Sequence, residues 1–393
     1  MALLSRRPVV VALVAAMALV TAAYAIYALA VPLRTDFVAM LTGARVLGDG
    51  GCLYCHAAQV QAQSGLLGQP HATFDPFLEM PLVALAYRPL LSLAPTSGYA
   101  AFLGLSALCV GAAGVLVWRR LGLASRGLAG MTLLALSLVS LPAAWNYHLG
   151  QVDAILVLPL VAGAALLAAS RPFPAGLLLS LPLLKPQTEW LVPFALLLVG
   201  QWRVVVGMAV GVAAWGGASL LMVGPGGIAQ WLSLLDQQGP AVATSIGLPG
   251  ALASLGGNGP GFAAAAVLGV MACGWLGWRR GSMAGRPLHA LALAVAGSLL
   301  LAPHVYAYDL IAMTVPLAVL ARRALAPALA GAVLLNAAHL VDTWLIASGP
   351  HLEALALCVI VMMLAADLRD RAVPAVNPSR AQLSVARSTT TGA

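Results

Sequence analysis

Asp36 is the residue best placed to do chemistry in this sequence. Residues 8–32 form a long apolar stretch without a charged side chain, and the segment 34–37, Arg-Thr-Asp-Phe, follows at once. A carboxylate in that position lies where a membrane meets water, and ionised groups near a bilayer are costly and usually functional. The pattern predicts that Asp36 is a catalytic general base. The alternative is structural, with Asp36 capping a helix over residues 37–47.

Lys185 is the single lysine of the chain and the second candidate. It lies between two short apolar stretches, just before Pro186, and a lone ammonium group in such a setting needs an anionic partner. That partner is a phosphate group of a substrate, the carboxylate of Glu189 four residues further on, or another carboxylate. The first alternative makes Lys185 a ligand of a donor phosphate.

Two polar segments that interrupt apolar stretches contain further candidates. The first, Asn146–Asp153, is rich in amides and hydroxyls that suit sugar hydroxyls, and the same groups also suit the capping of a loop. The second, His304–Asp309, combines a histidine with two tyrosines and a carboxylate, which can bind phosphate or sugar. Tyrosines are also common at membrane boundaries. His304 is the strongest candidate of this segment, as a second group for a donor phosphate.

The segment 52–56, Cys-Leu-Tyr-Cys-His, matches the pattern by which haem is attached covalently to proteins. A haem protein also needs an axial ligand and a polar domain large enough to enclose the ring, and the loop over 33–76 is short for that purpose. A zinc site that adds His71 matches no common spacing. The segment is therefore better interpreted as a pair of loop cysteines, with a disulfide as one possibility.

The elements that must position these residues are membrane helices. The sequence is 61% hydrophobic and 8% charged, whereas soluble proteins carry about 25% charged residues. We therefore predict an all-α polytopic membrane protein with about 12 transmembrane helices and with short re-entrant or surface helices on its outer face. The expected spans lie near 8–32, 99–118, 128–145, 151–170, 174–185, 188–201, 203–223, 261–278, 287–303, 309–321, 325–346 and 352–368.

Three of these expected spans are only 12 to 14 residues long, about 18–21 Å as helix, against a hydrocarbon core of about 30 Å. Short helices of this kind leave backbone and polar side chains at membrane depth, which is tolerated only around a buried or water-filled cavity. Two such interruptions contain Lys185 and His304. The segment 77–94 is apolar enough to span, but we interpret it as a re-entrant or surface helix because of the sidedness of the charges.

The distribution of arginine predicts the orientation. Of the 20 basic residues, 16 fall in clusters that can all lie on one side, which indicates the cytoplasmic face and argues against a nucleic-acid partner despite the net charge of +8. Both termini are then cytoplasmic, in a plasma-membrane protein whose candidate site faces outward. The expected organisation is one transmembrane domain over 1–368, with outer loops at 33–98 and 224–260. A disordered cytoplasmic tail follows at 369–393.

In their order and spacing these segments resemble glycosyltransferase family 87, enzymes of the glycosyltransferase C superfamily that use polyprenol-phosphate sugars. The resemblance extends over roughly residues 30–310. The matching pieces are Thr35-Asp36-Phe37 with Ala44-Arg45, Gly50 to Gln59, Pro76-Phe77 through Pro95, Asn146 with Gly150-Gln151-Val152-Asp153, Ala175 to Pro186, and Pro303 to Asp309.

Three positions depart from the family pattern. Cys55-His56 stands where the family has Asp-Pro, which indicates drift in a loop rather than a haem site. Glu79-Met80-Pro81 stands where the family more often has Tyr or Asn followed by two prolines. The loop 224–260 offers Ala243-Thr244-Ser245 in place of Asn-Gln-Ser. The last two of these departures imply that the acceptor specificity differs from that usual in the family.

The resemblance implies a glycosyltransferase C-type helical bundle and an inverting transfer of a sugar, usually mannose and sometimes arabinofuranose, from a polyprenyl phosphate to a lipid-linked or envelope glycan. Such a transfer needs one base for the acceptor hydroxyl and groups that hold the phosphate. Asp36 is expected to be the base, and Lys185 and His304 to bind the donor phosphate. The expected substrate-binding residues are Arg45, Asn146, Gln151, Asp153, Tyr306, Tyr308 and Asp309. No cofactor is expected and no metal is demanded.

The main alternative from another functional class is a transporter or lipid flippase. In that case Asp36, Lys185, His304 and Asp309 would form a path for an ion or substrate through the bilayer. A path predicts charges spread through the membrane depth, whereas the predicted positions gather near the outer boundary. This distribution favours an enzyme that works at one face.

Overall fold

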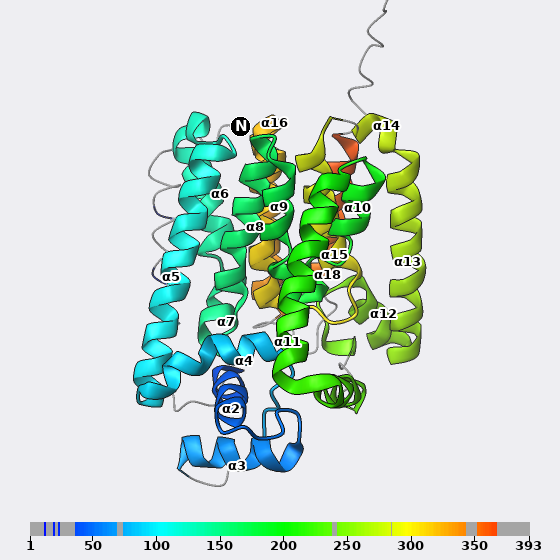
Figure 1. The fold of residues 1–393 in the computed structure, drawn as a ribbon. Coiled ribbons are helices and arrows are strands. Elements are labelled where there is room, and N and C mark those ends of the chain that lie inside the picture. The colour runs from blue at the N-terminus through cyan, green and yellow to red at the C-terminus, as the bar shows by residue number, and fades with distance from the viewer. Residues whose placement is uncertain are drawn as a thin grey trace, which may run out of the picture.

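The computed structural model describes residues 36–68, 74–237, 242–283, 285–342 and 352–367, together with single positions at 12, 19 and 23. These described residues are helical or in short connections, and none of them forms a strand. The longer helices run side by side as a bundle, and short helices cover one end of it (Figure 1). The expected first span at 8–32, apart from those single positions, and the expected tail at 369–393 lie outside the described residues.

Long apolar helices stand at the periphery of the bundle. α5 (Pro95–Arg120), α11 (Trp202–Gln237) and α13 (Asn258–Trp278) are long and apolar enough to cross a membrane. α6 (Gly127–Leu138) and α7 (Leu141–Leu149), bent by 40° from each other, make a fourth span if they are counted together. Large apolar side chains of the long helices point outward, for example Leu108 and Leu221. The described chain is therefore an all-helical protein with three or four candidate spans.

Shorter helices fill the interior. α8 (Asp153–Ala168) and α15 (Pro287–Leu301) lie within it, and nearly all of α15 is buried. A helix of 16 residues such as α8 measures about 24 Å, which is less than the hydrocarbon thickness of about 30 Å. The other shorter helices of the bundle are α9 (Pro172–Leu179), α10 (Val192–Leu198), α16 (Thr314–Arg323), α17 (Leu325–Leu340) and α18 (Leu352–Ala366).

The two interruptions predicted from the sequence lie where interior helices stop. After α9 the chain forms the 3₁₀ turns η3 (Pro182–Leu184) and η4 (Pro186–Thr188), with Lys185 between them. After α15 it enters η6 (Ala307–Met313), which leads into α16. Both places put polar side chains at helix ends, as the short apolar stretches indicate.

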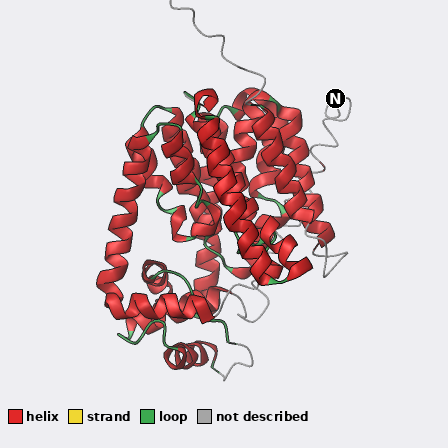
Figure 2. Cartoon of the chain, turned by 90° about the vertical axis from the view of Figure 1, so that its right-hand side faces the viewer, coloured by secondary structure: helices red, strands yellow, loops and turns green. Residues whose placement is uncertain are grey.

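Four short helices form the end of the molecule that contains Asp36. They are α2 (Asp36–Gly48), α3 (His56–Leu67), α4 (Pro81–Tyr87) and the 3₁₀ helix η1 (Arg88–Ser92). Figure 2 shows the long helices from the side, with short helices lying across their lower ends. α4 and η1 together span about 20 Å, too short to cross a membrane, as expected for the segment 77–94.

The segment 224–260 is more helical than the sequence suggests. α11 continues to Gln237 beyond a bend at Gly224, whose φ of 67° belongs to the left-handed region. Glycine adopts this conformation without strain, and Pro225 is suited to restart a helix. η5 (Val242–Thr244) and α12 (Leu248–Gly256) follow. The segment expected as the outer loop 224–260 therefore contains helices in its described part.

Gly150 brings the α7–α8 turn onto the first turn of α2. It ends α7 with a left-handed φ of 74°, and a β-carbon at this position would come within 2.5 Å of the Cβ of Phe37. Phe37 is itself buried among aromatic rings, with ring centroids 5.0 Å from Tyr99 and 5.4 Å from Phe102 of α5. The close approach places Asp36 beside Gln151.

We predict that Gly150→Ala lowers the free energy of unfolding by about 2–4 kcal/mol, because the new methyl group is strained by the left-handed φ and overlaps Phe37. Thermal unfolding in detergent measures this change. Gly104→Ala, in an exposed part of α5 where a β-carbon meets nothing, is the control and should stabilise by up to about 1 kcal/mol. Equal melting temperatures for both variants would contradict the described packing.

Candidate active site

Lys185 lies at the centre of a buried group of charges. Its Nζ is 2.6 Å from Oδ2 of Asp153 and 3.1 Å from Oδ1 of Asp309, and all three side chains are almost completely buried. A third hydrogen bond, of 3.3 Å, runs from Nζ to Oε1 of Gln151. An ammonium group has three hydrogens to donate, so each of them has an acceptor. The ring of Tyr308 packs on the same group, with Nζ 4.6 Å from its centroid.

Gln151 connects this group to Asp36. Its Nε2 donates a short hydrogen bond to Oδ2 of Asp36, while its Oε1 accepts from Lys185. Asp36 is the first described residue of α2, whereas Gln151 precedes α8. One amide side chain thus joins the candidate base to the only lysine of the protein.

Asn146 orients Asp153. Its Nδ2 donates to Oδ2 of Asp153 over 3.2 Å, and its Oδ1 accepts from the backbone N–H of Ala154 over 3.2 Å. The second bond occupies a free donor in the first turn of α8. The capping role that the sequence allowed for this segment is therefore present for Asn146, together with a direct contact to the charged group.

The segment His304–Asp309, which follows α15, completes the group of side chains around Lys185. The backbone N–H of Tyr306 donates to Oδ2 of Asp309 over 2.8 Å, which leaves Oδ1 to face Lys185. The imidazole of His304 packs edge-on against Tyr306, with ring centroids 4.8 Å apart. The Tyr306 and Tyr308 rings follow at 5.4 Å. The structure thus gathers most of the residues expected at the site.

Arg45 is the exception. It lies nine residues along α2 from Asp36, about 14 Å by helix rise, and its side chain is 53% exposed. Its Nε pairs with Oδ2 of Asp49 at 3.1 Å. Among the described residues no ion pair or hydrogen bond joins Arg45 to the charged group around Lys185, so the structure does not bring it together with the other expected site residues.

Of the partners considered for Lys185, the carboxylate of Glu189 is wrong, and two other carboxylates, those of Asp153 and Asp309, take its place. Residues 186–188 form a 3₁₀ turn and Lys185 itself has an extended backbone, with φ −118° and ψ 81°. Side chains four residues apart meet on an α-helix and not in this geometry. Glu189 is buried, and neither of its carboxyl oxygens has a hydrogen-bond partner among the described residues.

Glu79 is a member of the site that the sequence analysis treated only as a departure from the family pattern. Its partly buried carboxyl group interacts electrostatically with Lys185, Asp153 and Asp36. The signal in the sequence was an acidic residue inside an apolar segment, but nothing in the local pattern connects residue 79 to residue 185.

Four side chains hold the extended segment before Glu79 by its backbone. Gln63 bonds the carbonyl of Asp75, and Gln59 bonds both the N–H and the carbonyl of Phe77. Indole Nε1 of Trp231 donates to the carbonyl of Leu78, and the hydroxyl of Tyr54 donates to that of Glu79, each over 2.8 Å. These bonds fix the direction in which the segment enters α4.

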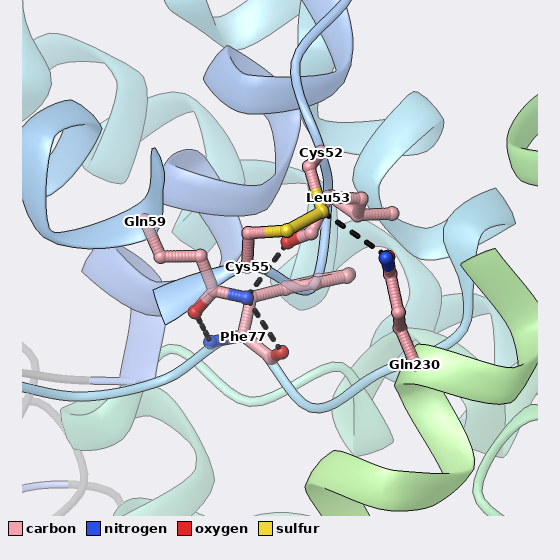
Figure 3. Close-up of a disulfide and its surroundings, with 6 residues drawn as sticks. All are labelled: Cys52, Leu53, Cys55, Gln59, Phe77 and Gln230. Atoms are coloured by element: carbon pink, nitrogen blue, oxygen red, sulfur yellow. Dashed lines mark hydrogen bonds between the residues drawn. A yellow bond between two sulfur atoms is a disulfide. The ribbon is translucent and has the colours of Figure 1, made fainter. Parts of the chain in front are cut away.

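The cysteines of the haem-like pattern belong to this scaffold. Cys52 and Cys55 form a disulfide, and Gln59 reaches from the following helix to Leu53 and Phe77 (Figure 3). Sγ of Cys52 also lies 3.1 Å from Oε1 of Gln230 on α11. Because both sulfurs are bonded to each other, neither is a thiol for haem attachment or a thiolate for zinc. Of the alternatives, the pair of loop cysteines is the one that the structure supports.

Comparison with known proteins gives an independent finding. The profile of glycosyltransferase family 87 matches residues 77–303, more than half of the 393 residues. The chain belongs to glycosyltransferase family 87. No curated protein and no solved structure matches it. The resemblance found in the sequence is confirmed, and family membership makes the protein a sugar transferase.

Burial changes the acid–base properties of the glycosyltransferase at the end that contains α2. Burial raises the pKa of Asp36, and the hydrogen bond from Gln151 opposes part of that rise. Burial likewise raises the pKa of Glu79 to about 7. Burial lowers the pKa of His304 to about 4, and the charge of Lys185 acts in the same direction. At neutral pH His304 is therefore a neutral hydrogen-bond donor and not a cation.

We predict that Lys185→Met lowers the free energy of unfolding by about 3–5 kcal/mol, because it leaves Asp153 and Asp309 buried without their counterion. Adding Asp153→Asn and Asp309→Asn to the same variant should recover at least half of the loss, since no charge then remains unpaired.

Denaturant or thermal unfolding in detergent compares these variants. Glu189→Gln is the control for a buried polar side chain nearby and should change stability by less than about 1 kcal/mol. If the triple variant is less stable than Lys185→Met alone, packing rather than charge governs the loss.

Proposed function

We propose that this family member is an inverting transferase that moves mannose from a polyprenyl-phosphate donor to a lipid-linked or cell-envelope glycan. The observation that carries the proposal is the chain of contacts from Asp36 through Gln151 to Lys185. It places a partly buried carboxylate for proton transfer one side chain away from a fixed positive charge. Both are parts that an inverting displacement of a phosphate requires.

In the proposed reaction the acceptor hydroxyl attacks the anomeric carbon of the donor sugar. A new glycosidic bond forms as the bond between that carbon and the phosphate oxygen breaks, and the bonding electrons leave with the polyprenyl phosphate. Asp36 takes the hydroxyl proton. Its raised pKa favours this role, because a more basic carboxylate accepts a proton more readily at working pH.

Lys185 stabilises the leaving phosphate from within its ion pairs. Its three hydrogens already have acceptors, and the bond to Gln151 is the longest of them at 3.3 Å. A phosphate oxygen that replaces Oε1 of Gln151 would gain a charge-assisted contact. His304 offers a neutral N–H beside it, and Tyr306 and Tyr308 offer ring faces and hydroxyls for the sugar.

Arabinofuranose is the second candidate donor sugar, since the resemblance in the sequence implies it for some relatives. A transporter or flippase is disfavoured by membership in a family of sugar transferases. We further propose a glycosyltransferase C-type bundle of about 12 spans in the plasma membrane. Both termini would then be cytoplasmic and the charged group would lie at the outer face. The short helices over this end and the arginines at the opposite end support that orientation.

The base assignment predicts that Asp36→Asn folds normally and loses turnover by about 10²–10⁴-fold. Asparagine keeps the shape and can still start a helix, but it cannot take a proton. The assay incubates membranes with radiolabelled polyprenyl-phosphate mannose and native lipids and follows the labelled product.

Glu79→Gln serves as the matched variant in that assay. It removes the charge of a second carboxyl group that interacts electrostatically with Lys185, and it should retain most turnover. The reverse outcome, with Glu79→Gln inactive and Asp36→Asn active, would transfer the base role to Glu79. Normal donor hydrolysis without transfer to any lipid would refute the proposed acceptor class.

The pH dependence provides a separate test. A general base works only when deprotonated, so kcat/KM should fall as pH drops through the pKa of Asp36. Because burial raises that pKa, the acid limb should lie above the usual aspartate value of about 3.8. The residual activity of Asp36→Asn should lack this limb. An unchanged limb in the variant would assign it to another group.

A further inference from the structure

We propose that the arginine-lined cavity at the end of the bundle opposite α2, α3 and α4 binds the phosphate headgroup of an anionic phospholipid. The cavity has a volume of about 680 Å³. It lies between the end of α8, the beginnings of α9, α11 and α15, and the end of α16 (Figure 1). The 16 residues of α8 separate it from Asp153 by about 24 Å, so it is distinct from the candidate active site.

The cavity is strongly basic. Arg286, Arg322 and Arg323 line it together with His289. One carboxylate is placed against them by the described residues, that of Asp367, which lies 2.6 Å from Nη1 of Arg323 and 3.5 Å from Nδ1 of His289. Arg286 and Arg322 line the same cavity beside the Arg323–Asp367 pair. Guanidinium groups bind phosphate in a two-pronged geometry.

The backbone adds to this preference. α9, α11 and α15 all begin at the cavity, and neither α9 nor α15 has a side chain that caps its first turn. The first backbone N–H groups of a helix and its dipole favour an anion. The arginine side chains and the helix N-termini therefore both favour a negatively charged ligand.

The remaining lining favours a lipid over a free phosphate. Leu167, Leu288 and Val319 give the cavity an apolar wall beside the arginines. A headgroup with its glycerol and the first part of an acyl chain offers both kinds of surface, whereas inorganic phosphate offers one. Basic pockets between membrane helices are known to suit anionic headgroups.

Two exposed tryptophans indicate the level of the membrane boundary at this end. Trp202 begins α11 directly after the cavity-lining Gln201 and is 57% exposed, and Trp278 ends α13 and is 77% exposed. The guanidinium groups of Arg203 and Arg279 lie 5.3 and 5.5 Å from these rings. Exposed tryptophans of this kind mark the headgroup layer, and the cavity lies beside one of them.

The test is a thermal-shift titration of the full chain in detergent with phosphatidylglycerol, with phosphatidylcholine and with glycerol 3-phosphate. Phosphatidylglycerol should raise the melting temperature to a plateau, as expected for a ligand of the folded state. In the variant Arg286→Gln/Arg322→Gln the midpoint of this rise should move to about tenfold higher lipid or more. Arg119→Gln, an exposed arginine at the same end that does not line the cavity, should keep the midpoint.

Three results would overturn the proposal. Equal stabilisation by phosphatidylcholine would mean that phosphate charge is not recognised. An equal shift of the midpoint in Arg119→Gln would indicate that the lipid binds to general surface charge rather than in this cavity. Stabilisation by glycerol 3-phosphate at the same concentrations would identify a soluble phosphate compound in place of a lipid. If the double variant does not fold, the exposed Arg322→Gln alone should weaken the lipid effect several-fold, and an unchanged midpoint in it would contradict the assignment.

Discussion

The ion pairs of Lys185 are the interaction on which the rest of the site depends. One ammonium group lies between two buried carboxylates, those of Asp153 and Asp309, which are 156 residues apart in the sequence. Burying any of these charges alone would cost several kcal/mol. The group is stable only when α8, the turn after α9 and the segment after α15 meet. Those three elements belong to the interior of the bundle. The ion pairs therefore form only in the folded bundle, and they in turn favour this packing of its elements.

Around this centre the structure uses amide side chains as connectors. Asn146 holds Asp153, Gln151 joins Lys185 to Asp36, and Gln59 fixes the segment that leads to Glu79. An amide has both a donor and an acceptor and carries no charge, so it links two polar partners without adding to the desolvation of a crowded site. The carboxylates outnumber the lysine, and the raised pKa values of Asp36 and Glu79 reflect that excess together with burial.

The all-helical class with apolar candidate spans and the polar residues that gather around Lys185 could be predicted from the sequence because each has a local signal. Lys185 and Asp36 stand out as charges beside apolar stretches, and Asp309 lies in a dense polar segment. Their contacts could not be predicted, because Gly150 against Phe37 and Asp309 against Lys185 are long-range packing. The local pairing of Lys185 with Glu189 failed because residues 186–188 form a 3₁₀ turn and not the α-helical turn that brings side chains four residues apart together. Glu79 was missed as a site residue because side chains from three other segments position it.

Because Asp36 and Asp309 are 273 residues apart, the residues of the site are synthesised at clearly different times. At roughly 5–20 residues per second, about 14 to 55 seconds pass between the emergence of these two aspartates from the ribosome. Asp153 leaves the ribosome before Lys185, and Lys185 before its second carboxylate, Asp309. Each of these groups must therefore stay hydrated or uncharged until its partner arrives, so the site closes only after the segment that follows α15 is in place. A chain halted before α15 would have every charged group of the site except Asp309, but the buried site that surrounds these groups would be incomplete.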